Sequence, residues 1–259
     1  MASLDCIIIS QSNMVNYEEY SKLPLDHLDI YSHLVYPRMI HYKDGFRSHL
    51  DVINKLSTGL FWNEEGPNEK INSLNIWNLP GFAGSHLASY LNEFKIGTLT
   101  INNLDAEWDA FCEAYEASSC SSLVGISTTF HLNFTEIKRL TSRLKEAYPG
   151  IEIVLGGAFI NVMVDGGKTQ ALIKAMKKYG VTYAVHSFNS EIDFKNLLLG
   201  RQQGKQNLGS LPNVIKVDSS TENGYIEGPH NWNDPILGES PANWHTLKMP
   251  FLNKTIQLR

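Results

Sequence analysis

Two short stretches of the sequence end apolar runs with residues that could bind a ligand. The stretch SLVGISTTF ends with the hydroxyl groups of Ser127, Thr128 and Thr129, and the stretch IEIVLGGAF contains Gly156 and Gly157. Hydroxyl groups donate and accept hydrogen bonds, whereas paired glycines allow either a tight turn or the close approach of a flat ligand to the backbone. These residues alone leave both explanations of the glycines open.

Helices and strands alternate along the chain around these two stretches. Apolar residues at helical spacing predict helices at 84–94, 106–117, 133–148, 169–180 and 190–200. Apolar runs predict strands at 5–10, 98–103, 123–128, 151–155 and 182–187. Uniformly apolar strands joined by amphipathic helices are typical of a parallel sheet covered on both faces. We therefore predict the α/β class, with a doubly wound parallel sheet whose core contains Ile7, Ile9, Val124, Ile126, Ile153, Leu155 and Val185.

The predicted sheet sets the domain organisation. Residues 1–200 form the doubly wound domain, and residues 11–75 are an insertion after its first strand. Residues 201–259 are rich in Gly, Pro and polar side chains, which predicts a hairpin followed by an extended connector. In such sheets, ligands bind outside the carboxyl ends of the strands, where the strand order reverses. Both the hydroxyl stretch and the glycine pair fall at such ends.

Known nucleotide-binding and metal-binding motifs do not fit the sequence. The run DGGKT resembles the end of a P-loop, but Val162 occupies the position of the first glycine, and no Gly-x-Gly-x-x-Gly follows a strand. Three cysteines at unrelated spacings and nine scattered histidines give no zinc pattern. His131 and His186 follow strand ends without an accompanying nucleophile or carboxylate. We therefore predict no metal ligand and no catalytic residue.

Composition and charge exclude several classes of partner. The net charge is -5 and no basic stripe is present, so we expect no nucleic acid partner. No run of about 18 apolar residues occurs and the N-terminus has no basic leader, so we expect no membrane span and a cytoplasmic location.

The order of motifs from residue 76 to residue 259 resembles one protein family. LPGFAGSHLASYL, LVGISTTF, IEIVLGGAFINV, YAVHSFNSE, SLPNVI and NGYIEG follow one another as in the N-terminal cobalamin-binding domain of cobalamin-dependent radical SAM enzymes. DCIIIS with NYEEY nearby, SLNIWNLPGFAGSHLASYL and GISTTF also resemble the phosphinate-methylating branch of these enzymes and its relatives. The resemblance implies cobalamin as cofactor and, in a longer parent protein, a radical SAM barrel in cis with S-adenosylmethionine and a [4Fe-4S] cluster. It implies a Rossmann-like or flavodoxin-like cobalamin-binding fold.

The resemblance also implies a set of site residues. The hydroxyls after the third strand would bond the nucleotide tail of cobalamin, and the glycine stretch after the fourth strand would line the slot for its flat base. The implied cofactor-binding residues are Leu79, Pro80, Gly81, Ser127, Thr128, Thr129, Gly156, Gly157, Ala158, Phe159, Ser187, Phe188 and Asn189. A branched side chain at Gly157 would be expected to fill this slot and leave the fold intact.

The sequence departs from the family pattern in three places. No Asp-x-His-x-x-Gly follows the first strand, so we expect no histidine on the lower face of cobalt. SFNSE keeps Glu191 but lacks the two glycines usual after the fifth strand. The cluster motif Cys-x-x-x-Cys-x-x-Cys is absent, so we expect either a fragment that ends before the barrel or a stand-alone remnant, and in both cases a chain that is not catalytic alone. The alternative is a non-catalytic, flavodoxin-like binding module for another ligand or a partner protein.

Overall fold

The computed structural model describes residues 4–10, 82–119, 121–129, 131, 133–187, 190–205 and 207–231, with short pieces between residues 39 and 70. The chain divides into two units, one of Met1–Ser12 with Pro80–Pro250 and one of Asn13–Leu79 with Phe251–Arg259. In the second unit, β2 (Met39–Tyr42) pairs antiparallel with β3 (Gly45–Ser48), and β4 (Trp62–Asn63) pairs antiparallel with β5 (Gly66–Lys70).

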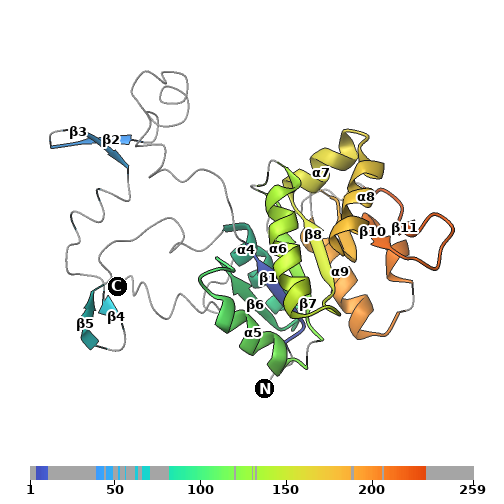
Figure 1. The fold of residues 1–259 in the computed structure, drawn as a ribbon, viewed down its shortest axis with the longest axis horizontal. Helices are drawn as coiled ribbons and strands as arrows, with labels where there is room; N and C mark the ends of the chain where they lie inside the picture. Colours follow the sequence, from blue (N-terminus) through green and yellow to red (C-terminus); the bar gives the residue numbers. More distant parts are fainter. Residues whose placement is uncertain are drawn as a thin grey trace. The chain divides into compact units, whose positions relative to one another are not determined.

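A twisted sheet of seven strands forms the centre of the first unit as far as the structure describes it (Figure 1). Its order is β11-β10-β9-β8-β7-β1-β6. The strands are β1 (Cys6–Ile9), β6 (Thr98–Ile101), β7 (Leu123–Ser127), β8 (Ile153–Gly156), β9 (Tyr183–Val185), β10 (Val214–Val217) and β11 (Tyr225–Glu227). The pairs that join β6, β1, β7, β8 and β9 are parallel, whereas β10 pairs antiparallel with β9 and with β11. The predicted fold class is confirmed, and the expected hairpin continues the sheet at its β9 edge.

Helices cover both faces of this sheet. One face packs against α5 (Trp108–Ala117), α6 (Phe134–Ala147), α7 (Ala158–Asp165) and α8 (Thr169–Tyr179). The other face packs against α4 (Phe82–Glu93) and α9 (Ser190–Gln202), and a short 3-10 helix, η4 (Leu208–Ser210), precedes β10. Because side chains alternate along each strand, Ile153 and Leu155 face the first group while Val154 faces the second. All seven predicted core residues are at most 2% exposed.

Two local features refine the sequence-based assignment. Asn133 is the N-cap of α6, since its side chain accepts a hydrogen bond from Thr135 N at 2.8 Å. Helix α7 was not predicted as a separate element, because its sequence AFINVMVD is short and rich in β-branched residues that favour helix weakly. It buries Ile160 and Met163, three residues apart, against the sheet, so tertiary packing decides its conformation.

Candidate functional site

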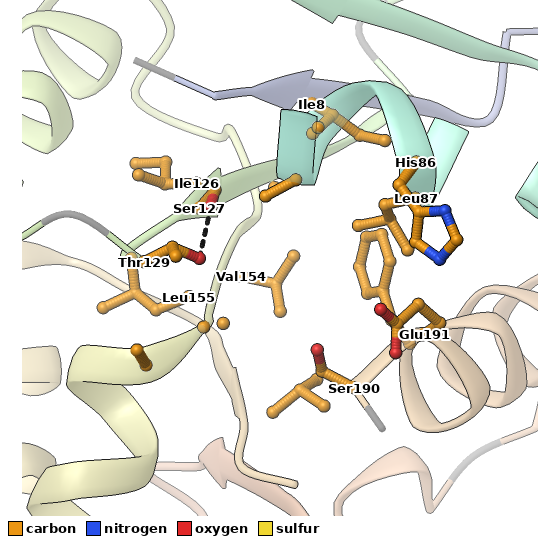
Figure 2. A pocket seen from close by; sticks show the side chains of 18 of the residues that line it. Ile8, His86, Leu87, Ile126, Ser127, Thr129, Val154, Leu155, Ser190 and Glu191 are labelled. Carbon is orange, nitrogen blue, oxygen red and sulfur yellow. Dashed lines mark hydrogen bonds between the residues drawn. The ribbon is translucent and has the colours of Figure 1, made fainter. Parts of the chain in front are cut away.

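A cavity of about 330 Å³ lies between the sheet and the helices α4 and α9 (Figure 2). It extends to the carboxyl ends of β7 and β8. Strand order reverses between β1 and β7, because β6 lies on one side of β1 and β7 on the other. Ligands of open α/β sheets bind at such a reversal point, so the position of the cavity is the one that this fold favours for a ligand.

Two rows of residues in register form the sheet side of the cavity. The inner row is apolar and consists of Ile8, Gly125 and Val154. The outer row, two residues nearer the carboxyl edge, consists of Ser127, Gly156 and Val185. Two residues of a strand span roughly 6.6 Å. The cavity floor is therefore apolar in its inner part and acquires a hydroxyl group only near the edge.

The first two turns of α4 and of α9 form the opposite wall. Helix α4 contributes Ala83, Gly84, His86 and Leu87, and helix α9 contributes Ser190, Glu191 and Phe194. Gly84 brings α4 close to the end of β1, because a Cβ atom at this position would lie 2.4 Å from Ser10 Cβ. Figure 2 shows His86 and Glu191 on one side of Val154, and Ser127 and Thr129 on the other.

The two glycines that end β8 have different roles. Gly157 is the N-cap of α7 and has φ 108° and ψ −175°, a conformation that only glycine adopts readily. A Cβ atom there would lie 2.9 Å from both the N and the Oγ1 of Thr129. The close approach that this glycine permits is therefore to the neighbouring loop, which supports the tight-turn explanation. The expectation that a branched residue at Gly157 would leave the fold intact does not agree with this geometry.

Gly156 is the glycine that opens the cavity. Its φ lies outside the left-handed region, and an added Cβ atom would meet only the carbonyl oxygen of Val185, at 3.8 Å. The missing side chain leaves free volume in the outer row of the floor, at a position where other residues of a strand carry side chains. A flat ligand could lie directly against the backbone there.

The three hydroxyl residues also separate into two groups. Ser127 Oγ and Thr129 Oγ1 lie 3.2 Å apart at the cavity (Figure 2), where both remain able to bond a ligand. Thr128 is fully buried, and its hydroxyl donates to the carbonyl oxygen of Gly156 at 2.8 Å. Thr128 N donates to the same oxygen at 2.7 Å. Thr128 therefore fastens the β7 loop to the end of β8 and does not line the cavity.

The predicted site residues are partly brought together. The cavity is lined by Ser127, Thr129, Gly156, Gly157, Ala158 and Ser187. Phe159 lies on the other side of the sheet, where its ring packs edge to face on Phe134 at 5.0 Å, because the first turn of α7 rotates it toward the other helix layer. Leu79, Pro80, Gly81, Phe188 and Asn189 lie outside the described residues.

Sequence reasoning missed the part of the lining that comes from helices and from strand interiors. Gly125 carried a detectable signal, since a glycine inside an apolar strand often marks the close approach of another group. Here that group is Phe194, whose Cζ would lie 3.4 Å from a Cβ atom on Gly125. Leu87 and Phe194 carried no separate signal, because apolar helix residues that line a cavity resemble those that fill a core.

Polar atoms next to the cavity include two without partners. Asn161 Nδ2 donates to the carbonyl oxygen of Ser187 at 2.9 Å. Within the described part of the chain, Asn161 Oδ1 and Ser187 Oγ have no hydrogen-bond partner although both are buried. Buried polar atoms of this kind are uncommon, and water or a ligand group usually bonds them.

The two buried histidines do not line the cavity in the described structure. Burial lowers the pKa of His131, and burial together with the neighbouring His230 lowers the pKa of His186. Both are therefore neutral at pH 7. Among the described residues, no group of three or more His, Cys, Asp or Glu side chains could hold a metal ion. The same part of the chain contains no helix that is both long and apolar enough to cross a membrane.

Comparisons of the chain with protein-family models, with curated proteins and with solved structures found no match. The cavity, its place at the reversal point of the sheet and the sequence motifs are therefore the features that bear on function.

Proposed function

We propose that this chain is the cobalamin-binding module of a cobalamin-dependent radical SAM methyltransferase. In this proposal the nucleotide tail of cobalamin enters the cavity between α4 and α9, and the chain positions the cobalt for methyl transfer to a substrate. The observation that carries the proposal is the apolar cavity at the reversal point of the sheet, opened by Gly156. In the same proposal, a radical SAM barrel in a longer parent protein would hold S-adenosylmethionine and the [4Fe-4S] cluster.

The residues present fit the tail of this cofactor. The cavity volume lies at the low end of the about 300–1,000 Å³ typical of ligand pockets, which suits one arm of a large ligand. The flat base would lie on Gly156 and Val154 under the side chains of Leu87 and Phe194. The hydroxyls of Ser127 and Thr129 would bond the polar sugar and phosphate near the carboxyl edge.

The bound cofactor would supply a cobalt that carries and releases a methyl group. The residues of this chain would bind the tail, hold it in one orientation and exclude water from the inner part of the cavity. Removing an aromatic base from water is favourable by about 25 cal/mol per Å² of buried apolar surface, so the apolar inner row would supply most of the affinity. The hydroxyls would supply orientation rather than affinity, because a net hydrogen bond contributes only about 0.5–1.5 kcal/mol.

A pair of glycine variants tests the proposal. Gly156→Leu places a side chain in the cavity without backbone strain, whereas Gly150→Leu is the matched control, because a Cβ atom on Gly150 meets nothing within 4 Å. Hydroxocobalamin binding would be measured by equilibrium dialysis and absorbance for both variants and for the parent chain. We expect the parent and Gly150→Leu to bind equally and Gly156→Leu to bind at least tenfold more weakly.

Three results would contradict the proposal. Equal binding by Gly156→Leu would place the tail elsewhere, and absence of binding by the parent chain would remove cobalamin as the ligand. Tight binding of flavin mononucleotide in the same dialysis, blocked by Gly156→Leu, would support the flavodoxin-like alternative instead.

A further inference from the structure

Residues 229–231, which follow β11, are hydrogen-bonded to Asn213, which directly precedes β10. Asn213 N donates to the carbonyl oxygen of Pro229 at 3.0 Å, and Asn213 Nδ2 donates to the carbonyl oxygen of Asn231 at 2.8 Å. Asn231 N donates to Asn213 Oδ1, also at 2.8 Å. The side-chain amide of Asn213 thus bonds both main-chain groups of Asn231, as a neighbouring strand would.

The same asparagine is fixed to the wall of the cavity. Asn213 Nδ2 also donates to Asp193 Oδ2 at 2.9 Å, and the carbonyl oxygen of Asn213 accepts from His186 N at 2.9 Å. Asp193 lies in the first turn of α9, between the cavity residues Glu191 and Phe194. His186 directly precedes the cavity residue Ser187.

Because of their burial and backbone conformation, loss of these contacts would be strongly destabilising. Asn213 is 0% exposed and Asp193 is 2% exposed, so neither side chain can exchange its partner for bulk water without a structural opening. Asn213 has φ 57°, a left-handed conformation that asparagine tolerates better than most residues. A second contact supports the segment, since the ring of His230 packs edge to face on His186 with centroids 5.3 Å apart.

We infer that Asn213, Asp193 and Asn231 form a polar clamp that couples occupation of the cavity to the attachment of residues 229–231. Asn213 is a positioning residue in this clamp, since it acts on the cavity only through α9 and the end of β9. A ligand that fixes the first turn of α9 holds Asp193 in place, which strengthens the clamp and the attachment of the segment. By thermodynamic reciprocity, release of the segment weakens ligand binding by the same factor.

This inference rests on the proposed function for the identity of the ligand. It adds that the attachment of residues 229–231 regulates ligand binding in the cavity. Residues 229–231 lead toward the C-terminal part of the chain, so movement of whatever follows them would reach the cavity through the clamp. Coupling between sites is typically 5–150-fold, and we expect roughly tenfold here.

Two substitutions separate the clamp from general effects on stability. Asn213→Gly keeps the left-handed backbone and removes the side-chain amide, so the segment loses its bonds to the side chain. Asn231→Ala is the matched control, because Asn231 enters the clamp only through main-chain atoms. Hydroxocobalamin affinity is measured by dialysis, and amide hydrogen exchange is followed at Asn231 and at Phe194 to Leu198 in α9, with and without saturating hydroxocobalamin.

We expect hydroxocobalamin to slow exchange at Asn231 roughly tenfold in the parent chain and in Asn231→Ala. In Asn213→Gly, affinity should fall by the same factor, and exchange in α9 should be faster even without ligand. Parent-like affinity in Asn213→Gly, with the Asn231 amide exchanging freely, would overturn the inference.

Two further outcomes keep the inference testable. If Asn213→Gly fails to fold, unchanged exchange at Asn231 on binding of hydroxocobalamin to the parent chain overturns it. If the parent chain does not bind hydroxocobalamin, the proposed function fails, and unchanged α9 exchange in ligand-free Asn213→Gly then overturns the clamp separately.

Discussion

Replacement of Gly157 by alanine tests the backbone geometry that the structure assigns to the end of β8. The native φ of 108° is one that a residue with a Cβ atom adopts at a cost of about 1–3 kcal/mol. The new Cβ atom would also lie 2.9 Å from Thr129 N, and overpacking of this kind costs about 1–3 kcal/mol. We therefore expect Gly157→Ala to lower the free energy of unfolding by about 2–6 kcal/mol.

Alanine variants of two other glycines separate the two causes of this loss of stability, which are backbone strain and steric overlap. Gly167 has φ 69°, and a Cβ atom on it would meet nothing within 4 Å. Gly167→Ala should therefore lower the free energy of unfolding by only about 1–2 kcal/mol, the cost of placing alanine in the left-handed conformation. Gly150 has neither constraint, and Gly150→Ala should change stability by less than about 1 kcal/mol. Urea unfolding followed by circular dichroism gives the three free energies. A Gly157→Ala variant as stable as Gly150→Ala would refute the assigned geometry.

Two more predictions concern the core and the buried histidines. Ile153→Asp should prevent folding, because Ile153 is 0% exposed and an unpaired buried carboxylate costs several kcal/mol. Ile153→Val should lower the free energy of unfolding by only about 0.5–1.5 kcal/mol. Soluble yield and urea unfolding distinguish the two variants. Burial lowers the pKa values of His131 and His186 from 6.5. Below pH 6.5 the folded chain therefore binds fewer protons than the unfolded chain. The free energy of unfolding should fall as the pH drops through 6.5. Substitution of both histidines by Gln should flatten the slope of unfolding free energy against pH, and an unchanged slope would show that other groups cause it.

The fold could be predicted from the sequence because its strands are short apolar runs and its helices carry regular apolar stripes. Val124 and Ile126, for example, belong to the apolar run that predicted a buried strand, and both lie in the core. The order of elements then required parallel strands with crossover helices. The sequence does not predict helix α7, because its helical conformation depends on packing against the sheet rather than on the helix propensity of its own residues.

The candidate site could be predicted only in part. The sequence predicts where the strands end, and the cavity extends to those ends. Ser127, Thr129 and Gly156 lie there and therefore line the cavity. The sequence could not determine which way each residue points after the strand ends. Thr128 turns inward to bond Gly156, and Phe159 turns to the opposite side of the sheet. The orientation of residues beyond a strand depends on loop geometry, which neighbouring elements fix.

A crystal structure of the chain grown with hydroxocobalamin tests the central claim most directly. The proposal predicts electron density for the nucleotide tail between α4 and α9, with its base over Gly156 and Val154 and its sugar near Ser127. A tail bound anywhere else on the chain, or a cavity that keeps the same water structure at saturating hydroxocobalamin, would contradict it.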